Sequence, residues 1–136
     1  MNRRNFLGTV GTAGAAALVA TVGTQAAAES MKSVADGTFQ GRSNHVTTGS
    51  VSIYKEGEVY IVELGDDFVL DGGPDPRVGF GKAGEYLGAE GYLGALQSLN
   101  GKQRYAVPKV WDVSAYDEVF IWCDVAGVPL GVASLK

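Results

Sequence analysis

The sequence has a single cysteine, Cys123, and a single histidine, His45, among its 136 residues. One cysteine cannot form an internal disulfide, so packing must stabilise the fold. A dithiol redox pair, a structural cysteine–histidine zinc cluster and a covalently bound c-type haem are also excluded, because each needs a second cysteine. A blue-copper centre needs two histidines and is excluded as well.

Basic side chains are few in most of the chain. There are 11 lysines and arginines against 15 aspartates and glutamates, and every carboxylate lies after residue 28. Since Arg3 and Arg4 precede that point, residues 29–136 carry a formal charge of about −6. This balance argues against nucleic acid as a partner and against binding to an anionic membrane surface.

The first 28 residues have the pattern of an export signal. Arg3 and Arg4 precede a glycine- and alanine-rich apolar run, which resembles a twin-arginine signal, and small residues end at Ala28. The alternative is a retained membrane anchor, since residues 6–22 approach the length that spans a bilayer. We expect cleavage after Ala28, a periplasmic or other extracytoplasmic location, membrane contact only during export, and a single domain at 29–136.

Short segments rich in valine, isoleucine, tyrosine and phenylalanine, separated by glycines, predict an all-β fold. "VSIY" and "EVYIVEL" flank Gly57 and predict a hairpin, and "PRVGFGKA", "KQRYAVP", "EVFIWCDV" and "VPLGVASL" predict further strands. Residues 80–103 leave a strand or a helical turn open, and "VWDVSAYDE" predicts one helical turn capped by Asp112 or Ser114. The expected architecture is an antiparallel β-sandwich or barrel-like domain of about seven or eight short strands.

The stretch "EVFIWCD" contains the only thiol and allows two interpretations. Its alternation places Cys123 on the same face as Val119 and Ile121, opposite Trp122. As a structural residue, the cysteine is a small buried apolar group. As a functional residue, it is a redox-active thiol or a soft ligand for iron or copper, with His45 as a second ligand if the fold brings it near. Otherwise His45 is a surface or capping residue of its polar loop.

The loop "GDDFVLDGGPDP" contains four aspartates, Asp66, Asp67, Asp71 and Asp75. Such a loop could supply oxygen ligands to calcium, although the spacing does not match an EF-hand. Aspartates beside glycine and proline more often shape turns through hydrogen bonds to the backbone. We therefore expect turn-forming roles for these carboxylates.

Four stretches, taken in order, resemble the DM-thirteen domain, the Skeletor-type electron-transfer family. They are "GTFQGRSNHVTTGSVSIY", "LGDDFVLDGGPDPRVGF", "LGALQSLNGKQRYAVP" and "DEVFIWCDVAGVPLGVASL", and together they cover residues 36–135. Each is weak alone, but the ordered set is fairly specific. Val128 departs from the pattern, where a larger aromatic residue is expected, and this affects packing more than chemistry.

The resemblance implies an extracytoplasmic β-sandwich or barrel-like domain, which in larger members lies beside haem-binding DOMON domains. The family's cysteine, proposed to take part in electron transfer, matches Cys123. Our hypothesis is that Cys123 is a redox group or a ligand to a haem or a transition metal, with His45 as a secondary participant and with Tyr105, Trp111 and Trp122 along the electron route. The partner would be a separate redox protein.

A second class of function stays open. A non-catalytic β-domain that binds a cell-envelope component or another protein would suit the acidic composition equally well. A deeply buried Cys123 would favour this alternative, and an accessible thiol within ligand distance of His45 would favour the redox role. No Gly-x-Ser-x-Gly motif is present, so an electron-transfer or binding domain is favoured over a stand-alone enzyme.

Overall fold

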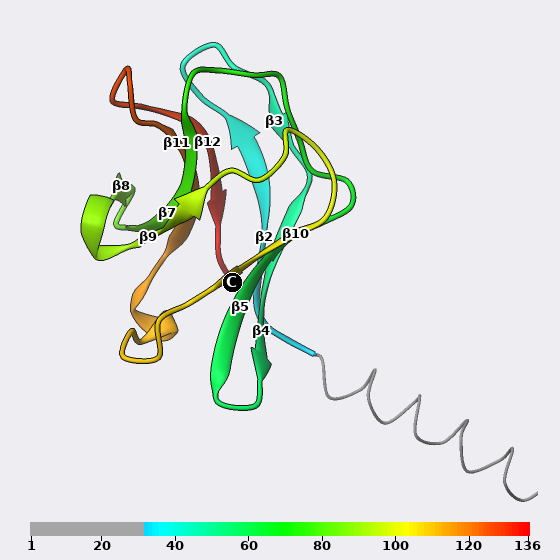
Figure 1. Ribbon diagram of the computed structural model, residues 1–136, viewed down its shortest axis with the longest axis vertical. Coiled ribbons are helices and arrows are strands. Elements are labelled where there is room, and N and C mark those ends of the chain that lie inside the picture. The colour runs from blue at the N-terminus through cyan, green and yellow to red at the C-terminus, as the bar shows by residue number, and fades with distance from the viewer. Residues whose placement is uncertain (1–31) are drawn as a thin grey trace, which may run out of the picture. The chain divides into compact units, whose positions relative to one another are not determined.

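The computed structural model describes residues 32–136, in which strands run from Ser33 at the start of the first to Ser134 at the end of the last (Figure 1). The expected signal segment, with Arg3, Arg4 and the cleavage after Ala28, lies outside the described residues. In the part of the chain that the structure describes, no helix is both long and apolar enough to cross a bilayer.

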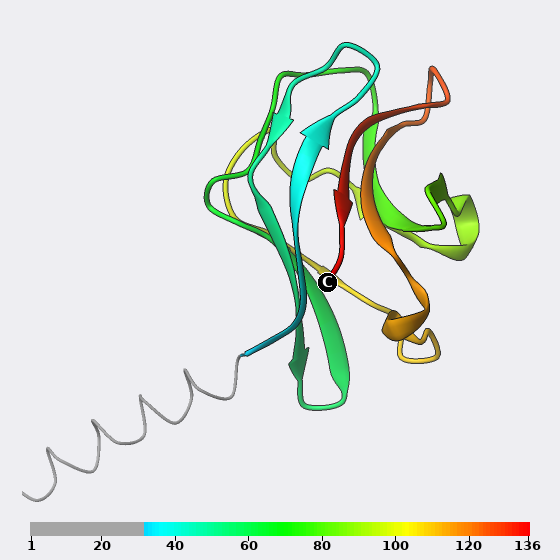
Figure 2. The same ribbon diagram turned by 180° about the vertical axis from the view of Figure 1, so that it is seen from behind.

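The main element is one strongly curled antiparallel sheet. Its strands are, in spatial order, β10 (Gln103–Ala106), β5 (Val59–Leu64), β4 (Ser50–Glu56), β2 (Ser33–Gly41), β12 (Val128–Ser134), β11 (Glu118–Cys123), β7 (Pro76–Lys82) and β8 (Glu85–Tyr86), and β9 (Tyr92–Ala95) also pairs with β7. The sheet curls so far that β9 contacts β10 (Figures 1 and 2). The predicted antiparallel all-β fold is confirmed, in the barrel-like form.

The β4–β5 hairpin shows why these residues form strands. Val51 and Ile53 of β4 and Val62 and Leu64 of β5 are fully buried, while the residues between them lie on the outer face. Burial of each such side chain stabilises the fold by about 1.5–3 kcal/mol. Gly57 adopts a φ of +63° in the connecting turn, a conformation that glycine accepts without strain. The predicted hairpin is therefore confirmed.

The curled sheet encloses a single hydrophobic core. Its buried members are Phe39, Val51, Ile53, Val62, Leu64, Phe68, Leu70, Val78, Phe80, Tyr105, Val107, Val119, Ile121, Cys123, Leu130 and Ala133. Aromatic pairs add to the packing: Phe39 meets Phe68 edge to face at 5.4 Å, and Phe80 stacks on Tyr116 at 4.1 Å between ring centroids. Such pairs contribute about 0.5–1.5 kcal/mol beyond their buried area.

Short elements complete the domain. A second sheet joins β3 (Thr47–Thr48) to β6 (Val69–Leu70), and two 3₁₀ turns are present, η1 (Gly88–Glu90) and η2 (Val113–Ala115). The region left open between residues 80 and 103 contains both a helical turn, η1, and a strand, β9. At η2 the carboxylate of Asp112 accepts a hydrogen bond from the Ser114 N–H at 3.0 Å, so Asp112 is the predicted cap.

Candidate functional site

Cys123 is the last residue of β11, on the inner face of the sheet. It lies in register with Val128 of β12 on one side and Pro76 of β7 on the other. It belongs to the core with Val119 and Ile121, as the alternation predicts, and only 1% of its surface is exposed. The thiol is therefore buried, which is the arrangement expected of a structural cysteine.

The sulfur nevertheless has polar partners. The Cys123 thiol donates a hydrogen bond to the carbonyl oxygen of Pro74 at 3.1 Å, and its sulfur accepts one from the Ala126 N–H at 3.4 Å. Because a carbonyl oxygen can only accept, this geometry belongs to the protonated thiol. Pro74 and Ala126 are both exposed residues. The sulfur thus lies beneath a cover one residue thick.

The loop of residues 71–75, which supplies the Pro74 carbonyl, has an unusual backbone. Gly72, Gly73 and Asp75 have φ values of +128°, +149° and +49°. A side chain at position 73 would also bring its Cβ within 3.2 Å of Leu130 Cδ1. The conformation therefore requires glycine where the chain crosses in front of the thiol.

One end of the 71–75 loop is tied to His45. The Nδ1 atom of His45 lies 2.9 Å from Asp71 Oδ1, and the Val46 N–H donates to Asp71 Oδ2 at 3.0 Å. These contacts, the Val46 hydrogen bond first and then the His45 one, hold the pKa of Asp71 below its usual value. His45 and Cys123 thus contact the same loop through different residues, and each side chain has its own partner.

The other end of the loop is tied to Arg77 and to the β11–β12 turn. Two guanidinium nitrogens of Arg77 donate to the Asp75 carboxylate at 2.9 and 3.1 Å. The Asp124 N–H donates to the Asp75 carbonyl at 3.3 Å, and the Asp124 carboxylate lies 3.9 Å from Arg77. Hydrogen bonding to Asp75 is the main reason that the pKa of Arg77 is raised.

An aromatic group lies on the outer face of the sheet beside this site. Trp122 stacks on Tyr86 with ring centroids 4.4 Å apart, and Arg77 lies over the ring of Tyr92 at 5.5 Å. Arg77, Tyr86, Tyr92 and Asp124, with two small residues of η1, line a shallow pocket of about 200 Å³. Burial is the main cause of the raised pKa of Tyr86.

The three aromatics expected along an electron route lie in different groups. Trp122 lies on the outer face of the sheet, opposite the face on which Cys123 lies. Tyr105 is buried on β10, where its hydroxyl donates to Gln103 Oε1 at 2.6 Å. Trp111 meets Tyr116 edge to face at 6.3 Å. No single line of contacts joins them to the thiol among the aromatic pairs of residues 32–136.

The carboxylates of Asp67 and Asp71 bind segments distant in the sequence, which differs from the local turn-forming role expected of them. Asp67 accepts hydrogen bonds from the N–H and the hydroxyl of Ser50, both at 2.9 Å, and these bonds lower its pKa. Asp71 and Asp75 make the loop contacts described above. Within residues 32–136, no three histidine, cysteine, aspartate or glutamate side chains gather as a metal-binding group.

A polar groove of about 540 Å³ lies elsewhere, on the outer face of β4, β2 and β12. Polar side chains on these strands line it, namely Asp36, Thr38, Gln40, Ser50, Ser52 and Ser134. Arg42 and Lys136 also line it. This groove is a second concave surface, separate from the cover of the thiol.

Sequence reasoning missed the residues that hold the thiol's cover in place. Arg77, Pro74 and Asp124 have roles that depend on contacts between distant segments. A signal was present: two aspartates bracket "GGP", which predicts a turn held by its carboxylates. What that turn would cover is not visible in the sequence, because Pro74 and Cys123 are 49 residues apart.

Fold and site together define a small all-β domain whose only thiol lies just beneath its surface. The model of one family, Electron transfer DM13, matches residues 38–135. This chain belongs to that family, as the resemblance noted above implied. A redox role in electron transfer, with a redox partner, therefore follows in general terms. No curated protein and no solved structure matches the chain.

Proposed function

We propose that this chain is an exported electron-transfer domain in which Cys123 is the redox group or the ligand of a haem or transition metal. The family membership supports the general role. One observation carries the assignment to Cys123: the chain's only thiol makes hydrogen bonds to two exposed residues, Pro74 and Ala126.

As a thiol redox group, Cys123 would lose one electron and its proton together. The electron passes to a one-electron oxidant carried by the partner protein, the proton passes to water, and the sulfur becomes a thiyl radical. The reverse step restores the thiol. Burial at 1% exposure would keep such a radical from other thiols and from oxygen, but it also slows any direct approach of the oxidant to the sulfur.

As a ligand, the sulfur would give up its proton and turn away from the Pro74 carbonyl. His45 is the second candidate, since the contact between its Nδ1 and Asp71 leaves Nε2 as the nitrogen for a metal. A haem or transition metal would supply the one-electron chemistry when bound. Each of these two side chains has its own partner at the 71–75 loop, so residues 32–136 hold no assembled set of metal ligands, and an exogenous group would have to complete the coordination.

The proposal of export rests on the twin-arginine-like signal around Arg3 and Arg4, with cleavage after Ala28. The periplasm or another extracytoplasmic compartment is the proposed location. Amino-terminal sequencing of the protein from its own host tests the cleavage.

A non-catalytic binding domain is the second candidate. The near-complete burial of Cys123 favours it, as does the 540 Å³ groove over β4, β2 and β12. In that case a cell-envelope component or another protein would occupy the groove, and the thiol would contribute only to packing.

The two candidates are separated by analysing protein purified from its own host. We compare the natural chain with Cys123→Ser and His45→Gln. Each protein is analysed by optical spectroscopy and for its metal content. Its thiol is titrated with a thiol reagent in the native and in the unfolded state. We expect a chromophore or metal lost in Cys123→Ser and weakened in His45→Gln, or slow native reactivity of the thiol. A colourless, metal-free protein whose thiol reacts only after unfolding would favour the binding domain.

A further inference from the structure

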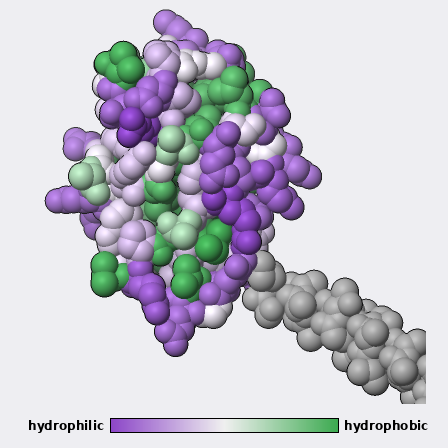
Figure 3. Space-filling model, in the orientation of Figure 1, coloured by the Kyte–Doolittle hydropathy of each residue, from purple (hydrophilic) through white to green (hydrophobic). Residues whose placement is uncertain are grey.

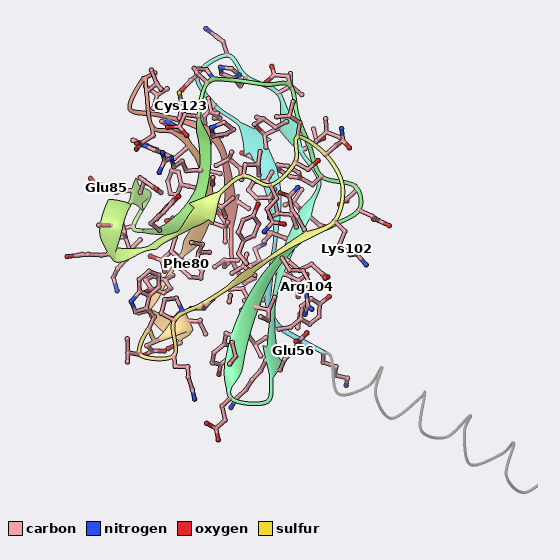
Figure 4. All side chains as sticks on the ribbon, viewed as in Figure 1. Glu56, Phe80, Glu85, Lys102, Arg104 and Cys123 are labelled. Atoms are coloured by element: carbon pink, nitrogen blue, oxygen red, sulfur yellow. The ribbon has the colours of Figure 1, made fainter. Side chains whose placement is uncertain are left out.

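We propose that the surface directly over the Cys123 sulfur is the docking site for a basic electron-transfer protein. This surface, called here the Cys123 cap, consists of Pro74, Asp75, Asp124, Val125 and Ala126. The inference rests on the proposed function, since it names the partner's chemistry and the place where it binds. Figure 4 shows Cys123 at the end of the domain opposite the β4–β5 turn.

The polar partners of the sulfur both belong to the cap. The sulfur is within hydrogen-bond distance of Pro74 and Ala126, and both residues are exposed. In the other directions the thiol faces β7, β12 and the core. A partner seated on the cap would therefore be separated from the sulfur by one layer of residues.

The centre of the cap is apolar. Val125, at the β11–β12 turn, is 71% exposed, and Pro74 and Ala126 are exposed beside it. In Figure 3 hydrophobic and hydrophilic surfaces adjoin at this corner of the molecule. Small apolar centres with polar rims are typical of transient protein interfaces.

The rim of the cap is negatively charged. Asp75 and Asp124 share one cation, Arg77, and Asp71 at the far end of the same loop pairs with His45. At the opposite end of the domain, Arg104 likewise contacts two carboxylates, Glu56 and Glu63, but a second cation, Lys109, contacts Glu58. Carboxylates are thus left in excess at the cap and are better balanced at the β4–β5 end.

Charge complementarity therefore selects a partner with a basic rim around an apolar centre. An excess of one charge at a docking site raises the association rate with an oppositely charged partner and makes that rate depend on salt. The cap is also held in place before binding, by the Arg77–Asp75 pair and the hydrogen bond from the Asp124 N–H to the Asp75 carbonyl. A fixed surface loses little entropy on docking.

The test is a titration of the full ¹⁵N-labelled mature domain with a small basic monohaem cytochrome, at low and at high salt. The natural chain is compared with Asp124→Asn and Asp124→Lys, and Glu58→Lys at the β4–β5 turn provides the same charge reversal at the other end. We expect amide shifts centred on the cap, at least a tenfold weaker binding in Asp124→Lys, a smaller loss in Asp124→Asn, and less than a twofold change in Glu58→Lys.

Shifts centred elsewhere, or equal losses in Asp124→Lys and Glu58→Lys, would overturn the docking site. The readout is binding, so it does not depend on the redox state of the sulfur, and Cys123→Ser should bind as the natural chain does. Docking at the cap by a domain without redox activity would refute the proposed function alone. Redox activity with docking elsewhere would refute this inference alone.

Discussion

The two ends of the domain are built in different ways. The β4–β5 end is a regular hairpin, in register from Val51–Leu64 to Glu56–Val59, with ion pairs on its surface. At the Cys123 end, a loop with three positive φ values crosses in front of a buried thiol and is tied at both sides by carboxylates. Gly72 and Gly73 accept their positive φ values without strain, so only Asp75 has a backbone conformation that is uncommon for its residue type.

The comparison shows that contacts between distant segments are concentrated at the Cys123 end of this small domain. Alternating side chains and a two-residue turn suffice to form the hairpin. The Cys123 end instead uses contacts between β11, the loop of residues 71–75 and the segment that holds His45. These contacts position one sulfur beneath one layer of residues, and the proposed function depends on them.

The largest effect should follow from removing the apolar support beneath the 71–75 loop. Leu130 is 1% exposed and lies under Gly73, so Leu130→Ala should leave a cavity there and destabilise the fold by about 2–5 kcal/mol. Val59→Ala, half-buried at the hairpin end, should cost less than about 1 kcal/mol. Urea unfolding measures both, and equal costs would remove the contrast between the ends.

A smaller effect is expected from adding a methyl group to glycines with positive φ. Gly73→Ala should cost about 1–3 kcal/mol and increase the native reactivity of the Cys123 thiol, because its Cβ meets Leu130. Gly57→Ala also has a positive φ but has open space around it, so it should cost about 1 kcal/mol and leave the thiol unchanged. Thermal unfolding and thiol-reagent kinetics measure the two results. Unchanged thiol kinetics in Gly73→Ala would show that the loop does not control access.

The smallest effect should appear in how the stability of the fold depends on pH. Asp67 and Asp71 have lowered pKa values in the folded protein, so their contribution to stability is present above about pH 4 and is lost as the pH falls through those lowered values. The double variant Asp67→Asn, Asp71→Asn should therefore have a flatter dependence of unfolding free energy on pH below about pH 4. Urea titrations at several pH values test this, and an unchanged slope would mean that other carboxylates control acid unfolding.

Much of the fold could be predicted because its long strands alternate clearly. Val51 and Ile53, or Val119 and Ile121, are spaced by two residues and lie on one face, and glycine marks the hairpin turn. The Asp112 cap was also predictable, since it depends on a residue two positions away. The two-residue strands β3, β6 and β8 are too short to show any alternation.

The site could be predicted only in part. The lone thiol and lone histidine were obvious candidates, and the sequence placed Cys123 on the inner face. The contacts that define the site join residues 26 positions apart, for His45 and Asp71, and 49 apart, for Pro74 and Cys123. These pairings arise from the curl of the sheet, which no local pattern encodes.

The most direct test of Cys123 as the redox centre is voltammetry of the mature domain isolated from its own host, compared with Cys123→Ser. We expect a reversible response that disappears in Cys123→Ser and persists in Glu58→Lys, whose substitution lies at the other end of the domain. A response of equal size in Cys123→Ser, or none in the natural protein, would contradict a redox role for this thiol.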